Sequence, residues 1–225
     1  SPLYPTGERT VFTVTALPLP LAAELARPFA DAPWASVLDR IAAAMPYALL
    51  AQHPEAAVQL GEDASSVLAE ASKRQNAAVA AISRATGWDG VRLFPTLDAD
   101  LFLTAFAEDY LLTAGTYGGV PVELAQRLSQ AIARAAPGTP ATMDEARTAA
   151  YALWVLTRSG EVATSRIEAL RAYMDERFPE WKKDPAAIFL AGAYQILRLK
   201  DEADALLKGR ISTARAGYPW SPESA

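Results

Sequence analysis

Any chemistry in this sequence would depend on carboxylates or on one histidine. Four acids lie in and around the start of a predicted helix: Asp98, Asp100, Glu108 and Asp109. Such a group can imitate the paired carboxylates of a glycosidase or the ligands of a cation. We favour a structural interpretation, because acids near a helix start are stabilised by the helix dipole and by capping. His53, the only histidine, precedes a proline at a predicted helix end, which is typical of a surface residue.

Other catalytic patterns are missing from the sequence. There are no cysteines, which removes disulfides, thiolate metal sites and cysteine nucleophiles together. We find no serine-centred nucleophile elbow, no phosphate loop of the form G-x-x-x-x-G-K-[ST], and no G-x-G-x-x-G after a strand. We therefore predict a protein that is not an enzyme, with no catalytic residue, no metal and no cofactor.

Composition narrows the class of partner. The chain has 225 residues, 51% of them hydrophobic, which is enough for one sizeable core or two small ones. The net charge is −5, and lysine and arginine are scattered along the chain, so nucleic acid is not expected as a partner. No run of about eighteen apolar residues is present, so we predict no direct membrane span.

The elements expected from the pattern are almost all helical. Residues 10–15 mix apolar and hydroxyl side chains in near alternation, which predicts one β-strand. Thr142 with Glu145 and Ser165 with Glu168 have the spacing of a capping box at a helix start. Apolar positions three and four residues apart predict helices over about 20–30, 36–51, 63–85, 99–115, 121–136, 142–159, 163–177, 185–199 and 201–214.

Short connections between these helices favour antiparallel neighbours. The helix starts in the second half are about twenty residues apart, yet no sequence repeat keeps a fixed period. The predicted fold class is therefore all-α: an incomplete α/α toroid of antiparallel helical hairpins, preceded by one N-terminal β-strand from an adjacent β-sandwich. The domains we expect are a strand and linker over 1–19 and the toroid over 20–225, truncated at the C-terminus.

A turn rich in glycine and aromatic residues, 87–95, separates two of the long predicted helices. We interpret Trp88 and Phe94 in two ways. Either they plug the end of the helical core, which is the usual place for large aromatic side chains, or they form a surface that contacts other molecules. His53 is a third candidate for such a surface.

At this turn the sequence resembles the helical thioester domain of bacterial α2-macroglobulins. That domain shows an R-Q-N remnant, a glycine-aromatic stretch ending in W-P, a T-A-Y-A-x-D-x-L-L helix and then V-P. The ordered counterparts here are Arg74 to Asn76, the 87–95 turn, Phe102 to Leu112, and Val120 with Pro121. Later segments, 149–160 and 187–207, are similar to further helices of the family, so the resemblance covers about 10–220.

Reactive members of that family carry Y-P-x-G-C-x-E-Q, whose cysteine and glutamine condense to an internal thioester. The counterpart here is the segment 32–39, which places Ser36 at the cysteine position and Asp39 at the glutamine position, flanked by Pro33 and Trp34. A hydroxyl gives at best an ordinary ester, and a carboxylate is a poor acyl donor without activation. We expect Ser36 to be a helix N-cap, with Asp39 in the acidic first turn.

The resemblance implies a parent protein of the thioester-lacking kind, exported to the periplasm and restraining proteases by conformational change. Its expected partners are other domains of the same long chain, and proteases or companion periplasmic proteins. Two other interpretations stay open. One is a helical-repeat scaffold of the tetratricopeptide sort; the other is an α/α-barrel enzyme acting on carbohydrate, using Asp98, Asp100 or Glu108 near His53.

Overall fold

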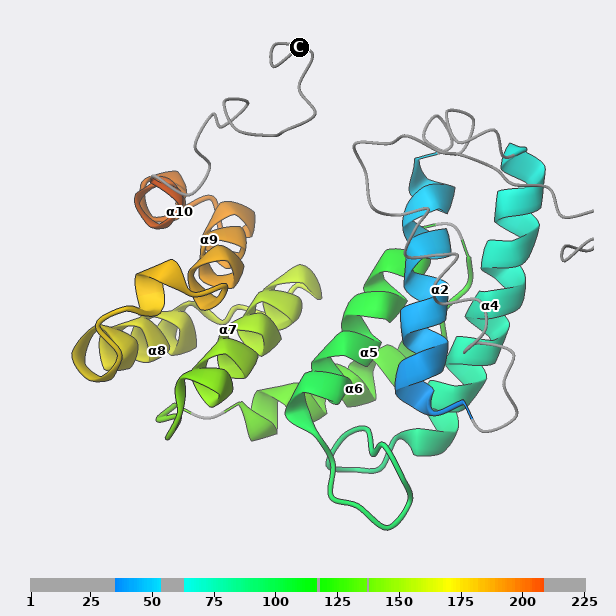
Figure 1. The fold of residues 1–225 in the computed structure, drawn as a ribbon, viewed down its shortest axis with the longest axis horizontal. Coiled ribbons are helices and arrows are strands. Elements are labelled where there is room, and N and C mark those ends of the chain that lie inside the picture. The colour runs from blue at the N-terminus through cyan, green and yellow to red at the C-terminus, as the bar shows by residue number, and fades with distance from the viewer. Residues whose placement is uncertain (1–34, 54–62, 117, 137, 209–225) are drawn as a thin grey trace, which may run out of the picture.

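A computed structural model describes residues 35–53, 63–116, 118–136 and 138–208 (Figure 1). Within these ranges the structure is helical, and its one strand-like pairing is an isolated antiparallel bridge between Thr86 and Val91. The elements are α2 (Val37–Gln52), α4 (Ala64–Ala85), α5 (Leu101–Ala114), α6 (Val122–Ala135), α7 (Met143–Arg158), α8 (Thr164–Arg177), the 3₁₀ helix η1 (Trp181–Lys183), α9 (Ala186–Ile196) and α10 (Lys200–Leu207). The all-α fold class is confirmed.

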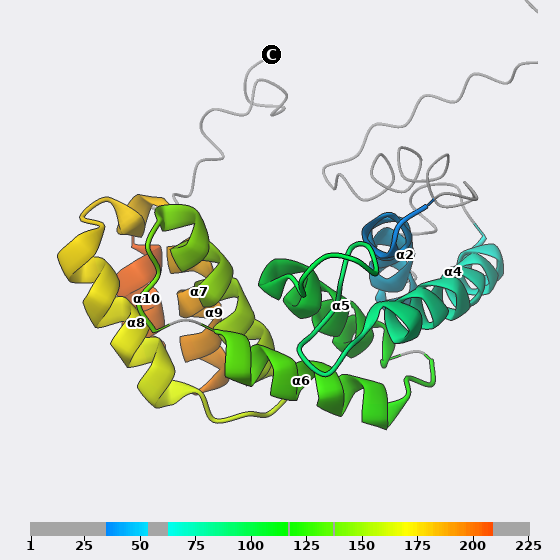
Figure 2. The same cartoon turned by 90° about the horizontal axis from the view of Figure 1, so that it is seen from below.

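The helices form two layers of antiparallel hairpins. Helices α2, α5, α7 and α9 pack against one another in that order, and each also packs against the helix that follows it along the chain: α4, α6, α8 or α10. Figure 2 shows these hairpins succeeding one another from the α2–α4 pair to the α9–α10 pair. This two-layered succession is what the predicted toroid requires, and closure into a ring remains a prediction.

Small side chains fill the contacts within the inner layer. Alanines with almost no exposed surface lie on the facing sides of α7 and α9, among them Ala149, Ala150, Ala187 and Ala191. Because alanine adds little bulk, the two helix backbones can approach closely there. A second core lies between α2, α4, α5 and α6, centred on larger residues such as Ile41, Ile82, Tyr110 and Leu128.

Most helix boundaries agree with the prediction to within two residues. Asp63, Asp100 and Thr142 each accept a hydrogen bond from a backbone amide in the first turn of their helix. The reciprocal bond of the predicted capping box is not made to Thr142: the carboxylate of Glu145 accepts instead from the amide of Ala141, the residue before the cap, at 2.7 Å. The predicted strand 10–15, the predicted helix 20–30 and all positions after 208 lie outside the described residues.

Two local predictions are wrong. Ser165 does not cap α8; the cap position is Ala163, without a side-chain bond, and Glu168 instead accepts a hydrogen bond from the Tyr194 hydroxyl at 2.7 Å. Helix α9 ends at Ile196 rather than at 199, because Arg198 adopts a left-handed backbone with φ of 62°. The amide of Leu199 then bonds to the Tyr194 carbonyl, which closes the helix end without a glycine.

None of the described helices combines the length and the hydropathy that crossing a bilayer requires.

Candidate functional site

Ser36 and Asp39 form a capping box at the start of α2. The amide of Asp39 donates to Ser36 Oγ at 3.2 Å, and the amide of Ser36 donates to Asp39 Oδ2 at 2.8 Å. The Ser36 hydroxyl also donates to Asp39 Oδ2, at 2.8 Å. The predicted N-cap is thus confirmed; Pro33 and Trp34 lie outside the described residues.

Within this capping box, the Ser36 hydroxyl is not activated as a nucleophile. The partner of the hydroxyl is a carboxylate that is itself engaged with the backbone, and His53, the only histidine of the chain, lies at the other end of α2. A serine needs an adjacent general base, and an acyl donor needs a leaving group better than a carboxylate oxygen. The geometry stabilises a helix start and gives no means of forming an acyl bond.

A cleft of about 570 Å³ joins this helix start to the glycine-rich turn. Its walls come from the first turn of α2, the last turn of α4 and the segment 92–95, so Ser36 and Phe94 line the same space. Arg40, Arg84 and Arg92 line it too. The fold therefore brings together Ser36 and Phe94, two positions that the sequence singled out, in a cleft whose charged lining residues are all arginines.

Hydrogen bonds hold the turn in a compact form. Arg92 Nη2 donates to both carboxylate oxygens of Asp89, at 2.8 and 2.7 Å, and the amide of Gly87 donates to the Gly90 carbonyl at 2.8 Å. Gly90 has φ of 133°, and a Cβ atom there would lie 2.5 Å from Thr104 Oγ1, so only glycine fits. That hydroxyl accepts from the Val91 amide at 2.9 Å, which fixes the turn to α5.

Trp88 and Phe94 point outward from this turn. Their side chains are 79% and 54% exposed, so the interpretation that they plug the core is wrong. Val91 occupies the buried position instead. The carbonyl of Trp88 accepts a hydrogen bond from Arg134 Nη2 at 2.5 Å, which anchors the turn to α6 while the indole stays at the surface. Exposed aromatic side chains on a fixed turn are typical of a contact surface.

The residues of the R-Q-N remnant have structural contacts. The guanidinium of Arg74 lies over the Tyr47 ring, 4.7 Å from its centroid, and Nε is 2.8 Å from Glu70 Oε1. Gln75 Nε2 donates to the Gly119 carbonyl at 3.1 Å, tying α4 to the segment before α6. Arg74 and Gln75 are both buried; the contacts of Arg74 lie within the α2–α4 hairpin, and the Gln75 bond connects that hairpin to the next.

Asp100 and His53 do not form one site. Asp100 caps the start of α5, where its carboxylate accepts from the Leu103 amide at 2.6 Å. His53 is the C-cap of α2, and the adjacent Gln52 side chain donates to the Thr113 carbonyl near the end of α5. The 14 residues of α5 span about 21 Å between these two ends. Catalysis that pairs His53 with Asp100 is therefore excluded by distance.

Asp109 takes part in a polar cluster on the inner layer. Its carboxylate accepts from the Tyr151 hydroxyl at 2.8 Å and forms an ion pair with Arg158. Arg158 in turn lies over the Trp154 ring, 4.9 Å from its centroid. These contacts join α5 to α7. Among the described residues, no group of three or more histidine or acidic side chains lies close enough to hold a metal ion.

Glu108 has an environment that its sequence neighbours did not reveal. Its side chain has no exposed surface, and Oε1 accepts a hydrogen bond from the Ser129 hydroxyl of α6. Oε2 has no hydrogen-bond partner. Ser159 lies nearby, but its hydroxyl donates to the Leu156 carbonyl at 2.8 Å. Burial raises the pKa of Glu108 to about 7; the nearby hydroxyls of Ser129 and Ser159 oppose the rise, and the negative charge of Glu161 adds to it.

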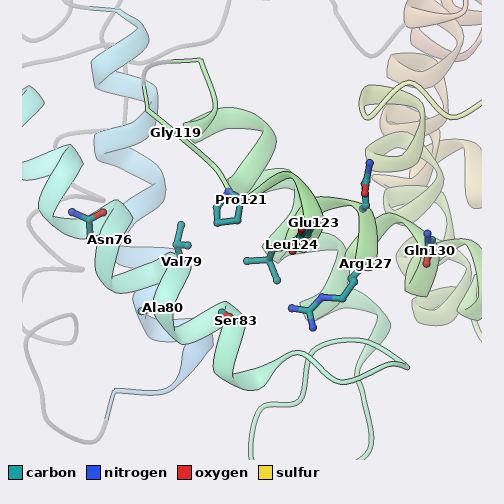
Figure 3. A pocket seen from close by; sticks show the side chains of 11 residues that line it. Asn76, Val79, Ala80, Ser83, Gly119, Pro121, Glu123, Leu124, Arg127 and Gln130 are labelled. Atoms are coloured by element: carbon teal, nitrogen blue, oxygen red, sulfur yellow. The ribbon is translucent and has the colours of Figure 1, made fainter.

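Two further clefts adjoin α6. One, of about 810 Å³, lies above Glu108 between α5, α6 and the turn after α7. The other, of about 790 Å³, lies between the outer helices α4 and α6 (Figure 3). Figure 3 shows Val79 of α4 across from Leu124 of α6 and from Pro121, the N-cap residue of that helix, with polar side chains such as Arg127 around them.

Replacing Ser36 with alanine is expected to lower the free energy of unfolding by about 1 kcal/mol, because the first-turn amide of Asp39 loses its side-chain acceptor. Urea denaturation followed by circular dichroism measures this change. Ser36→Thr keeps the acceptor and serves as the matched control, with a loss of a few tenths of a kcal/mol at most. Equal stability of the alanine variant and the unaltered chain would contradict a capping role.

Comparison with curated proteins finds relatives that are much longer than this chain. An alpha-2-macroglobulin homolog of Yersinia pestis is 28% identical over 204 residues, covering 87% of this chain and 10% of that protein. Alpha-2-macroglobulin of Rickettsia conorii is 31% identical over 112 residues, covering 49% of this chain and 6% of that protein. Alpha-2-macroglobulin of Pasteurella multocida is 26% identical over 137 residues, covering 59% and 7%. No protein-family model matches, and no solved structure matches.

Proposed function

Because this chain is homologous to part of the bacterial alpha-2-macroglobulins, we propose that it is a non-catalytic helical domain that contacts other proteins without a thioester bond. The chain spans a tenth or less of the length of these relatives, so its role is proposed as that of one domain. The parent would act in the periplasm, restraining proteases or assembling with companion proteins.

The observation that supports this proposal is the capping box formed by Ser36 and Asp39, the two residues that the family resemblance aligns with the thioester cysteine and glutamine. Ser36 and Asp39 are joined there by hydrogen bonds that begin α2, and the chain has no cysteine to supply a sulfur. Without an acyl bond, a partner must be held by shape, apolar contact and charge. We assign Ser36 and Asp39 to the degenerate thioester position on this basis.

The contact surface that we propose is the glycine-rich turn together with the basic cleft beside it. Trp88 and Phe94 present exposed aromatic rings, and aromatic residues supply much of the binding energy at protein interfaces. Arg40, Arg84 and Arg92 line the neighbouring cleft, which favours an acidic stretch on the partner. His53 lies at the opposite end of α2 and would not contribute to this surface.

Binding to proteases with blocked active sites tests the proposal, because a blocked protease cannot digest the chain. Trypsin, elastase and subtilisin would each be passed over the immobilised chain and the dissociation constant measured by surface plasmon resonance. We expect reversible binding of at least one of them. Trp88→Ala should weaken that binding by about 10-fold or more, as expected for a buried aromatic anchor at an interface.

The matched control is Val162→Ala, which shortens another exposed apolar side chain, 84% exposed, on the loop between α7 and α8. This variant should bind as tightly as the unaltered chain. Equal affinity of the Trp88 and Val162 variants would show that the turn is not part of the interface. Absence of binding to every protease, and to any other domain of the parent chain, would overturn the proposed function itself.

A further inference from the structure

We propose that the cleft between α5, α6 and the turn after α7 binds the ammonium group of a lysine side chain presented by a protein partner. This inference rests on the proposed function only in assuming that the chain contacts proteins. It concerns a different cleft from the one beside the 87–95 turn, because the two clefts share no lining residue. The space amounts to about 810 Å³, which is ample for one long side chain.

The floor of the cleft holds an acceptor that the fold leaves unused. Glu108 Oε2 is buried and has no hydrogen-bond partner, whereas Oε1 accepts from Ser129. A buried polar atom without a partner is rare in folded proteins, and a donor from a bound molecule would satisfy it; the nearby Ser159 hydroxyl donates to the Leu156 carbonyl instead. A bound ammonium group supplies both the missing hydrogen bond and the opposite charge.

The electrostatic surroundings favour a cation. Glu161 lines the rim of the cleft, and no lysine, arginine or histidine lines any part of it. The C-cap residues of α5 and α7, Gly115 and Ser159, both lie in its wall, so the partially negative C-terminal ends of two helices face it. Two carboxylates and two helix ends thus combine without a compensating positive group among the lining residues.

The shape of the lining selects lysine over other cations. Leu111, Leu112, Val120, Val122 and Ala125 form apolar walls, which suit the four-carbon stem of lysine. An arginine fork prefers two oxygens in one plane, but Glu108 offers a single unengaged oxygen. A divalent metal ion prefers several oxygen ligands, and the described residues hold no cluster of three or more such side chains.

Access to the floor requires a small rearrangement. Because Glu108 has no exposed surface, the incoming ammonium group must displace side chains that cover it. Gln126 and Gln130 line the cleft from the exposed side of α6 and are long enough to swing aside. Their amide oxygens can then accept the remaining hydrogens of the ammonium group.

Titration with a lysine analogue tests the proposal on the full chain. N-acetyl-lysine methylamide would be added while amide nuclear magnetic resonance shifts are followed at pH 8. We expect saturable shifts at Thr116, Ser129 and Ser159, three lining residues from different elements.

Glu108→Gln keeps the shape but removes the charge, and should weaken binding by about 10-fold or more. Binding to the unaltered chain should also weaken at pH 6, where Glu108 is protonated; Glu161 is the only other titratable group in the lining.

Three controls test the ammonium charge, the position of the removed carboxylate and the choice of lysine over arginine. N-acetyl-norleucine methylamide has the same stem without the charge and should not bind measurably, and Glu176→Gln, an exposed charge change on α8, should leave lysine affinity unchanged. Tighter binding of the arginine analogue than of lysine would overturn the choice of lysine. Equal binding of norleucine, or full affinity in Glu108→Gln, would overturn the site. If the proteases still bind the chain while lysine does not, this inference alone fails.

Discussion

Replacing Trp181 with alanine is expected to lower the free energy of unfolding by about 3–5 kcal/mol, the largest effect that we predict for a single substitution. Trp181 is the bulkiest fully buried side chain in the described residues, with 1% of its surface exposed. It lies in η1 between α8 and α9 and belongs to the core that joins α7 to α10. Removing it leaves a cavity and also strips Asp175 Oδ1 of the indole donor, which lies 3.0 Å away.

Urea denaturation followed by circular dichroism at 222 nm measures this loss. Trp88→Ala removes the same atoms from the surface and is the matched control, with an expected change within about 0.5 kcal/mol. A loss of similar size in the two variants would show that Trp181 is not a core residue, and would contradict the described core that joins α7 to α10.

Stability should also depend on pH through one buried carboxyl, that of Glu108. Burial raises the pKa of Glu108 from 4.5 to about 7 in the folded chain, while in the unfolded chain the group returns to its ordinary value. Between these two pH values the folded state keeps a proton that the unfolded state has released. The free energy of unfolding therefore falls as pH rises from about 4.5 to about 7, by about 3 kcal/mol from this group, and the contribution is constant above that range.

Glu108→Gln removes the titrating group and keeps a side chain that can bond to Ser129. The stability of this variant relative to the unaltered chain should increase by about 3 kcal/mol between pH 4.5 and pH 8. Urea denaturation at a series of pH values measures the difference, in which the other carboxylates cancel. The exposed control Glu176→Gln should show a nearly constant difference. A constant difference for Glu108→Gln as well would mean that its carboxyl is solvated and ionised in the folded chain.

The helical fold could be predicted from the sequence because its signals are local. Three helix starts have a residue type that favours the N-cap position, and each of these residues accepts the side-chain bond that a cap requires: Asp63, Asp100 and Thr142. Gly160 follows the end of α7, and its φ of 94° allows the Glu161 amide to donate a hydrogen bond to the Leu156 carbonyl. These contacts span a few residues, so they depend little on the rest of the fold.

Features that depend on tertiary contacts could not be predicted in the same way. Arg198 ends α9 in a left-handed conformation that favours glycine or asparagine, so its sequence gives no stop signal. Glu168 lies three residues after Ser165, the spacing of a capping box, but its carboxylate accepts a hydrogen bond from the Tyr194 hydroxyl of another helix. Such partners arise only when α8 and α9 are packed together.

The candidate site was predicted in part. Ser36 was singled out by the family resemblance and its capping role by its residue type, whereas the cleft that brings Phe94 beside it depends on how α2 and α4 pack. Glu108 stood in the sequence as one of four clustered acids. A periodicity argument places it among apolar residues of α5, but its burial against Ser129 of α6 needed the fold.

The central claim is that this chain meets its partners without a covalent bond, and denaturing mass spectrometry of the intact chain tests it most directly. The mass would be measured alone, after incubation with methylamine, and after incubation with an active-site-blocked protease. We predict the mass of the unmodified sequence in all three cases, with the protease released on denaturation. A chain one water lighter, as an ester between Ser36 and Asp39 would make it, or a stable adduct with the amine or the protease, would contradict the account.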